Sequence, residues 1–266
     1  MKVLGLTGNF SLKNTLECGQ CFRWWRGTDG FFCGVVDGRS VRVAQHGQEL
    51  LFEEADAGWD DKFWRNYLAL DEDYNDIEAR LQRVPILNAA YNLLPGVRIL
   101  RQDVWEVLIS FIVSQNNNIK RIKGIISRLC QLAGTRLVFD AYAFPTPGQL
   151  AAFDIVSLKD IGCGFRARYL LAATRMVLAG EINLQKLASE QNEQVMITLQ
   201  QIPGVGPKVA ACVLLFGLGR LDVAPVDVWI KRGLQRFFPA GWPQELAGIE
   251  GVAQQYLYHY QRMNLA

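Results

Sequence analysis

A lysine and an aspartate, each at the expected start of a helix, are the side chains best suited to covalent chemistry in this sequence. Lys208 follows the turn Pro203-Gly204-Val205-Gly206 and a proline, and Asp227 follows Pro225-Val226. The positive end of a helix dipole opposes a cation at Lys208, and a neutral amine is a nucleophile. A carboxylate stabilises an oxocarbenium-like sugar cation. The pair therefore fits attack on a sugar carbon. If Asp227 lies close, it favours the charged amine instead, and the sequence leaves the balance between these two effects open.

Two helices must position this pair. Pro207 suits a first helical position, where its missing N–H is not needed, and the apolar run that follows ends after Phe216 at a glycine. Asp227 is the expected N-cap of the next helix. The hairpin of residues 202–206, with Gly204 and Gly206, would point backbone N–H groups at a phosphate without reading sequence. A packing turn, a solvated lysine and a structural cap are the alternatives for the separate parts, and their combination favours chemistry.

The stretch from Gln201 to Arg232 resembles the helix-hairpin-helix DNA glycosylase superfamily, in which a hairpin, a lysine and a downstream Val-Asp occur in this order and spacing. The resemblance implies base flipping, attack of Lys208 on C1′ and expulsion of the base. A Schiff base would then permit β-elimination, with Asp227 stabilising the cationic sugar. The hairpin would hold a DNA phosphate, either directly or through a monovalent cation.

The segment Leu16 to Trp24 reads LECGQCFRW. It resembles the Gly-Gln-x-Phe-Arg-Trp segment of the 8-oxoguanine DNA glycosylase family. In that family the glycine carbonyl accepts a hydrogen bond from N7–H, a proton that the oxidised base has and guanine lacks. The resemblance gives this role to Gly19. Taken alone, the segment would be a turn at the entry to a strand.

Four side chains are predicted to complete a base pocket. Gln254 and Tyr258 are four residues apart on the last helix, and Lys208 and Cys212 have the same spacing on theirs, so each helix can present a pair to one cavity. The resemblance places Gln254 on the Watson–Crick edge of the base, with Tyr258 on one base face and Cys212 on the other. Pro225 is assigned to the same pocket. An amphipathic terminal helix with a surface glutamine is the alternative.

Three consecutive asparagines, Asn116 to Asn118, disfavour helix and strand and predict an exposed turn between two helices. An exposed turn of amides beside an arginine suits the gap left by a flipped base. The segment Ser110 to Cys130 resembles the family's Asn-Asn-Asn-Ile-x-Arg. The resemblance implies that Asn116 occupies the vacated space and that Arg121 contacts the orphaned cytosine. An ordinary turn with a solvated arginine is the alternative.

A second glycine-rich segment, Gly162 to Arg166, resembles the family's Gly-x-Gly-Tyr-Arg. Arg166 matches a second arginine that reads the orphaned cytosine, and a bidentate arginine discriminates bases by about 1–3 kcal/mol. Phe165 replaces the tyrosine of the mammalian-type pattern. Its ring can still wedge beside the estranged base without the hydroxyl. A phosphate contact for Arg166 and a core position for Phe165 are the alternatives. A further departure is Trp229, at the place of a phosphate-holding histidine.

Composition and charge narrow the class of protein. Half of the 266 residues are hydrophobic, which is enough for a substantial core, and no apolar run reaches the length of a membrane span. The N-terminus is too short and polar for a secretory signal. Residues 1–95 carry 10 Lys and Arg against 14 Asp and Glu, and residues 96–266 carry 18 against 12. The DNA footprint is therefore expected in the C-terminal part.

The six cysteines are scattered, and only Cys18-Gly-Gln-Cys21 forms a CxxC. Nothing nearby completes a zinc site. The C-terminus lacks the four-cysteine cluster with which some superfamily members hold an iron–sulfur centre, so no such cofactor is expected. All six are expected to be thiols in a reducing cytoplasm, with the protein associated with the nucleoid if the source is bacterial. His46 and His259 are expected to be surface or structural residues.

The expected fold class is α+β. An N-terminal antiparallel β-sheet domain, residues 1–95, packs on an all-helical helix-hairpin-helix glycosylase domain, residues 96–266, with a last helix over 250–263. Short alternating runs predict strands at Val3 to Leu6, Cys21 to Trp25, Phe31 to Val36, Val41 to Ala44 and Glu49 to Phe52, with Asp37-Gly38 as a hairpin turn. Helices are expected from residue 57, with Trp59 in the first of them, and Pro95-Gly96 marks the boundary.

These features predict a monomeric, bifunctional DNA glycosylase and AP lyase that excises 8-oxoguanine from duplex DNA in base excision repair. Three alternatives stay open. A helix-hairpin-helix glycosylase for alkylated bases would share the aspartate but usually lacks the lysine. An endonuclease III-like enzyme for oxidised pyrimidines would have the lysine but normally the iron–sulfur cysteines too. A non-catalytic DNA-binding module would need neither Lys208 nor the pocket pair.

Overall fold

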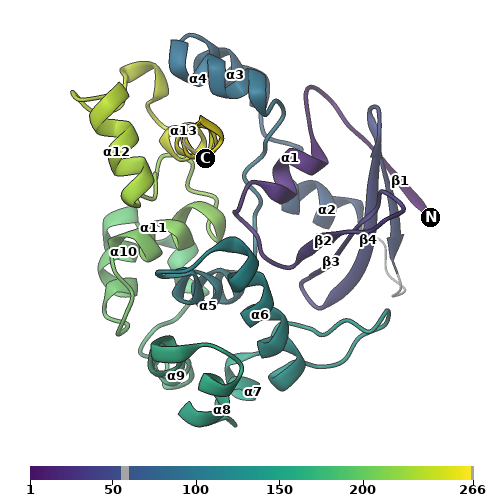
Figure 1. The fold of residues 1–266 in the computed structure, drawn as a ribbon, viewed down its shortest axis with the longest axis vertical. Helices are drawn as coiled ribbons and strands as arrows, with labels where there is room; N and C mark the ends of the chain where they lie inside the picture. Colours follow the sequence, from purple (N-terminus) through teal and green to yellow (C-terminus); the bar gives the residue numbers. More distant parts are fainter. Residues whose placement is uncertain (55–59, 265–266) are drawn as a thin grey trace.

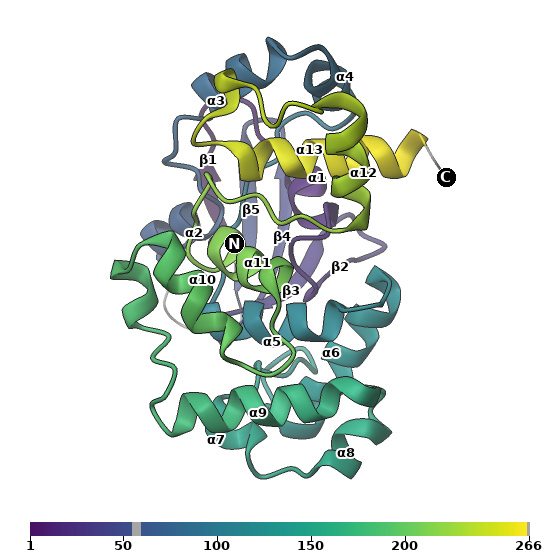
Figure 2. The ribbon, with the colours of Figure 1, turned by 90° about the vertical axis from the view of Figure 1, so that its left-hand side faces the viewer.

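The computed structural model describes residues 1–54 and 60–264. A sheet lies on one side of the molecule, and helices form the remainder (Figure 1). Figure 2 shows α10 (Asn192–Gln200), α11 (Pro207–Phe216), α12 (Val228–Phe237) and α13 (Glu250–Asn264) on the side away from the sheet. This arrangement confirms the predicted fold class. Trp59, which was expected in the first helix after the sheet, lies outside the described residues. No described helix has the length and apolarity needed to cross a membrane.

The sheet has five antiparallel strands in the order β1-β5-β4-β3-β2. Asp37 and Gly38 have φ values of 49° and 71°, as a two-residue hairpin turn requires, which confirms the predicted turn. The second strand begins later than predicted, at Trp24 rather than Cys21, because Gln20 and its neighbours are held by side-chain hydrogen bonds instead of strand pairing. The strands are β1 (Lys2–Gly5), β2 (Trp24–Arg26), β3 (Phe32–Val36), β4 (Arg39–His46) and β5 (Glu49–Glu54).

One face of the sheet packs on α1 (Leu12–Glu17) and α2 (Asp61–Tyr67) to form a small core. Phe52 and Trp64 lie at its centre, with ring centroids 4.9 Å apart. Trp24 can lie flat on the sheet because Gly34 has no side chain, and a Cβ there would come within 2.4 Å of the indole. The six cysteines of the chain are all free thiols.

The helices share a second, larger core. At its centre α5 packs on α11, and the rings of Phe111 and Phe216 stack with centroids 5.3 Å apart. Asp103 caps α5 by accepting a hydrogen bond from the backbone N–H of Glu106. The remaining helices are α3 (Tyr74–Gln82), α4 (Pro85–Leu93), α5 (Val104–Ser114), α6 (Ile119–Ala133), α7 (Pro147–Leu150), α8 (Ile155–Asp160), η1 (Gly164–Arg166), α9 (Ala167–Leu178), η2 (Lys186–Ser189), α10 (Asn192–Gln200), α11 (Pro207–Phe216), α12 (Val228–Phe237), η3 (Gln244–Leu246) and α13 (Glu250–Asn264).

Helices α3 and α4 precede Pro95-Gly96 in the chain, yet their buried side chains belong to the larger core. α4 packs on α13, where the rings of Tyr91 and Tyr256 lie 5.8 Å apart. The segment that enters α5 contacts both the last helix and the core of the sheet, because Val97 N donates to the Tyr256 hydroxyl at 3.2 Å and Leu100 belongs to the smaller core.

Gln20 connects the two cores. It is fully buried, and its Nε2 donates to the carbonyls of Arg98 at 2.7 Å and Thr15 at 2.9 Å. Its Oε1 accepts from the backbone N–H of Leu100 at 2.9 Å. Because a buried amide is costly to leave unpaired, this network fixes the neighbouring Gly19 relative to the segment that enters α5.

Candidate active site

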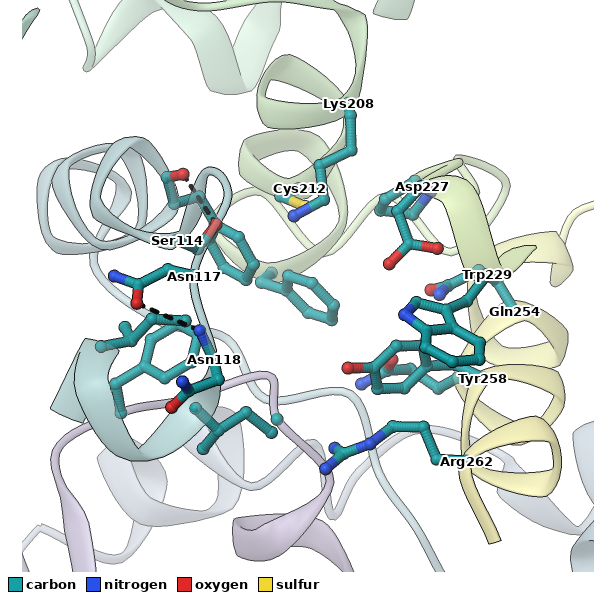
Figure 3. A pocket seen from close by; sticks show the side chains of 18 residues that line it. Ser114, Asn117, Asn118, Lys208, Cys212, Asp227, Trp229, Gln254, Tyr258 and Arg262 are labelled. Atoms are coloured by element: carbon teal, nitrogen blue, oxygen red, sulfur yellow. Dashed lines mark hydrogen bonds between the residues drawn. The ribbon is translucent and has the colours of Figure 1, made fainter. Parts of the chain in front are cut away.

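A cavity of about 260 Å³ opens between the helices and residue 19, close to the lower end of the roughly 300–1,000 Å³ range of small-ligand pockets. Every residue predicted for the catalytic pair and the base pocket lines it (Figure 3). The lining residues are Gly19, Phe22, Phe111, Ser114, Asn117, Asn118, Ile119, Ile122, Lys208, Cys212, Phe216, Pro225, Asp227, Trp229, Gln254, Gln255, Tyr258 and Arg262.

Lys208 lies in the first turn of α11, which begins at Pro207 as predicted. Its side chain reaches into the cavity beside Cys212 (Figure 3). The ammonium nitrogen lies 4.9 Å from the centroid of the Phe111 ring, and within the described residues it takes part in no ion pair. Burial raises the pKa of the Cys212 thiol, and the nearby charge of Lys208 partly offsets this effect. The amine therefore faces the cavity without a carboxylate that neutralises it.

Asp227 is the N-cap of α12, as the sequence predicted. Its Oδ1 accepts a hydrogen bond from the backbone N–H of Ile230 at 2.8 Å. The carboxylate points into the cavity from the wall facing Lys208 (Figure 3). One oxygen can thus hold the helix start while the other remains available to a bound sugar, so capping and chemistry are compatible.

Gln254 and Tyr258 project from α13 into the same cavity (Figure 3). Gln254 is 5% exposed, and its Oε1 is a buried oxygen without a hydrogen-bond partner in the described part of the chain. A buried acceptor left unpaired costs about 1–3 kcal/mol, so this oxygen is expected to receive a donor from a ligand. The alternative of a surface glutamine is wrong.

Gly19 lines the same cavity with a left-handed backbone, φ 83°. A Cβ there would come within 3.2 Å of Ile119 Cδ1. Only glycine adopts this conformation easily. The backbone conformation, as well as the position in the cavity, therefore explains why residue 19 is a glycine.

The four residues predicted to contact the opposite strand lie outside the cavity. Asn116, with φ 48°, and Arg121 are exposed, and Phe165 is 46% exposed, which excludes the core alternative for Phe165. Arg166 is only 3% exposed. Its guanidinium donates to the carbonyls of Gln115, Asn116 and Cys163, and the Phe165 ring lies 4.4 Å from it. In the free protein Arg166 therefore supports the asparagine turn, and its role toward cytosine stays a prediction.

The sequence analysis did not identify Gln115 or Arg262 as part of the site, and it connected Trp229 only with a phosphate, not with the cavity. Gln115 Nε2 donates to Gly204 O at 3.0 Å, which ties the asparagine turn to the hairpin. Trp229 and Arg262 line the cavity near Tyr258 (Figure 3). Arg262 follows Tyr258 by four residues, a spacing that places both on one helix face and could have revealed it. No comparable pattern indicates Gln115.

The two glycines of the 202–206 hairpin have different surroundings. Gly204 has φ 84°, and a Cβ there would lie 2.3 Å from the Tyr169 ring. Gly206 has φ −97° and open space at its Cβ position. The turn therefore packs on α9 through Gly204 and leaves Gly206 free at the start of α11.

Alanine substitutions at these two glycines should affect the free energy of unfolding differently, because Gly204 is packed and Gly206 is open. Gly204→Ala is expected to lower the free energy of unfolding by about 2–4 kcal/mol, because it adds both left-handed strain and a clash with Tyr169. Gly206→Ala, the matched control, should cost about 1 kcal/mol or less, because Gly206 makes no side-chain cap bond and its Cβ position is open. Urea unfolding measures both. Equal effects would mean that the Tyr169 contact does not fix the hairpin.

The fold and site define a helix-hairpin-helix protein in which an amine and a carboxylate face one cavity. Two family profiles match the chain. That of the 8-oxoguanine DNA glycosylase N-terminal domain covers residues 3–108, and that of the HhH-GPD superfamily base excision DNA repair protein covers residues 109–247. The chain therefore belongs to the HhH-GPD superfamily of base excision DNA repair proteins.

The similarity to known proteins extends over the whole chain. The solved structure of MBOgg1 in complex with a low affinity DNA ligand is 38% identical, with a TM-score of 0.91 and complete coverage of both chains. The Clostridium acetobutylicum 8-oxoguanine glycosylase/lyase, solved with dsDNA containing cytosine opposite 8-oxoG, is 34% identical with a TM-score of 0.89, over 97% of this chain and 93% of that one. The N-glycosylase/DNA lyase of Saccharomyces cerevisiae is 33% identical over 85% of this chain and 67% of its own length.

Proposed function

We propose that the protein is a bifunctional DNA glycosylase and AP lyase that removes 8-oxoguanine from duplex DNA in base excision repair. The observation that carries this proposal is the unpartnered, buried Oε1 of Gln254 in the cavity that also holds Lys208 and Asp227. An unpaired buried acceptor in the cavity of a nucleophile fits a base whose Watson–Crick edge supplies N–H groups. The likeness to an 8-oxoguanine glycosylase/lyase and to an N-glycosylase/DNA lyase supports the same activity.

The reaction follows from the positions of these side chains. An extruded nucleotide places its C1′ between Lys208 and Asp227. The neutral amine of Lys208 forms a bond to C1′ while the bond from C1′ to the base breaks. The departing base takes up the proton that the amine releases. Opening of the sugar ring then gives a Schiff base, and loss of a C2′ proton expels the 3′ phosphate. Asp227 stabilises the positive charge that develops on the sugar.

Recognition of the oxidised base is assigned to Gly19 and Gln254, which line the same cavity. The Gly19 carbonyl would accept the N7–H that guanine lacks, and Gln254 would pair with the Watson–Crick edge. Tyr258 and Cys212 would enclose the base faces. Outside the cavity, Asn116, Arg121, Phe165 and Arg166 would contact the opposite strand, and the hairpin with Gly204 and Gly206 would hold a phosphate.

Duplexes with 8-oxoguanine opposite each of the four normal bases test the proposal. Base release is expected from the cytosine duplex, with strand cleavage visible before any alkaline treatment. Release of alkylated bases without strand cleavage would favour an alkyl-base glycosylase, and release of oxidised pyrimidines alone an endonuclease III-like enzyme. Binding without release of any base would indicate a DNA-binding module.

Several further proposals rest on the sequence alone. The protein would act as a monomer in the cytoplasm, without an iron–sulfur cluster. A monovalent cation would connect the carbonyls of the 202–206 hairpin to a DNA phosphate. Size-exclusion chromatography, and DNA binding in potassium against a large organic cation, would test the monomer and the cation.

A further inference from the structure

The two recognition walls of the cavity come from opposite ends of the chain. Gly19 belongs to the loop after α1, and Gln254 and Tyr258 belong to α13. His259 connects these walls directly, since its Nε2 lies 2.7 Å from the carbonyl oxygen of Cys18. The expectation of a surface or merely structural residue thus omitted a contact with the residue before Gly19.

The chemistry of this contact fixes which nitrogen carries a proton. A carbonyl oxygen only accepts, so Nε2 must be the N–H donor. Burial lowers the pKa of His259, although the bond to Cys18 acts in the opposite direction and Arg262 contributes to the lowering. The imidazole also meets the Tyr258 ring edge to face, with centroids 5.5 Å apart. The hydrogen bond to Cys18 and the ring contact with Tyr258 together fix the orientation of the imidazole.

Cys18 O belongs to the peptide plane that leads into Gly19. A hydrogen bond to that oxygen fixes the rotation of the plane, and with it the start of the left-handed turn at Gly19, φ 83°. On the other side of Gly19, the Gln20 side chain is held by Arg98 O and Leu100 N. Gly19 thus lies between one anchor on the segment that enters α5 and one anchor on α13.

The other contact between α13 and this loop is weaker. Gln255 Nε2 lies 3.5 Å from Cys18 Sγ, and sulfur is a weak acceptor. It holds a side chain rather than the peptide plane. His259 is therefore the stronger determinant of where the Gly19 carbonyl lies relative to Gln254.

We propose that His259 is a positioning residue for base discrimination, which holds the Gly19 carbonyl at the distance from Gln254 that a base with an N7–H requires. This inference rests on the proposed function. Recognition of such a base needs the Gly19 carbonyl and the Gln254 side chain at the right distance from each other. Guanine lacks the N7–H and therefore makes no hydrogen bond to the Gly19 carbonyl. Loss of the His259 bond should then weaken recognition of 8-oxoguanine while the reaction at an existing abasic site continues.

Three variants test the inference. His259→Phe keeps a ring against Tyr258 but removes the donor, and His259→Gln keeps an N–H at a similar reach. His46→Phe is the matched control, because His46 is exposed at the end of β4. The assays are single-turnover release of 8-oxoguanine opposite cytosine and incision of a preformed abasic site. Equilibrium binding of 8-oxoguanine and guanine duplexes is also measured, with Lys208→Gln added to each variant to prevent turnover.

His259→Phe is expected to slow release of 8-oxoguanine by about tenfold and to lower the preference for 8-oxoguanine over guanine duplexes by a similar factor, as the loss of one well-made hydrogen bond would. Incision of the abasic site should stay within about twofold of the unsubstituted protein. His259→Gln should recover most of the loss, and His46→Phe should change nothing.

Each contrary result has a distinct meaning. Unchanged preference in His259→Phe would overturn the inference. Equal losses on 8-oxoguanine release and abasic-site incision, or equal weakening of both duplexes, would show that His259 only stabilises the fold and would also overturn it. Failure of the unsubstituted protein to release 8-oxoguanine would instead contradict the proposed function.

Discussion

Replacement of Lys208 by glutamine should reduce 8-oxoguanine release by at least about 10³-fold, the scale on which loss of an essential nucleophile acts. Strand incision at an abasic site should fall with it, because both reactions pass through the same covalent bond to C1′. The side chain faces the cavity and takes part in no ion pair within the described residues, so the substitution leaves no buried charge behind.

Borohydride reduction provides the direct measurement. The unsubstituted protein should form a stable covalent complex with an 8-oxoguanine duplex, and Lys208→Gln should form none while it still binds the duplex. Lys62→Gln, an exposed lysine of α2 on the sheet side, is the control and should be trapped normally. A trapped complex that persists in Lys208→Gln would assign the Schiff base to another amine.

Local chemistry explains why the sequence predicted the positions of Lys208 and Asp227 well. The start of α11 is set by Pro207, and the start of α12 by the capping bond of Asp227, so neighbouring residues decide where each side chain lies. The spacing of four between Gln254 and Tyr258 likewise depends only on helix geometry. All of these positions, together with the Asp37-Gly38 turn, appear in the structure where they were predicted.

Long-range hydrogen bonds could not be predicted in this way. The bond from His259 to Cys18 joins residues 241 positions apart, and that from Gln115 to Gly204 joins residues 89 apart. Neither has a periodicity or a motif that would mark it. The late start of β2 has the same origin, because Gln20 is held by Arg98 and Leu100, far along the chain, rather than by a strand partner.

Arg166 is buried in the free protein, and its contacts there do not reveal the DNA contact that the sequence predicted for it. Its segment predicted an arginine that reads a base, yet in the free protein the guanidinium donates to the backbone carbonyls of Gln115 and Asn116 at the asparagine turn and to that of Cys163. Contact with an orphaned cytosine would need some of these bonds to be exchanged when DNA binds. The sequence specifies the residue type but not how its donors are shared between the turn and the base.

Asp227 is expected to show two separable effects, because one side chain caps α12 and faces the cavity. Asp227→Asn keeps an oxygen that can accept from the Ile230 N–H but removes the negative charge. Its free energy of unfolding should stay within about 1 kcal/mol of the unsubstituted protein, while single-turnover release of 8-oxoguanine should fall by about 10²–10³-fold, the usual scale for loss of one electrostatic contact to a transition state. Asp227→Ala should lose both, with a further cost of about 0.5–2 kcal/mol for the missing cap.

Asp154 provides the matched control, since it caps α8 with the same 2.8 Å bond, to the Ser157 N–H, and does not line the cavity. Asp154→Ala should cost a similar amount of stability and leave base release unchanged. If Asp227→Asn instead retains full activity while Asp227→Ala loses it, the aspartate acts by holding the start of α12 and not through its charge. The developing sugar cation would then have to be stabilised by another group in the cavity.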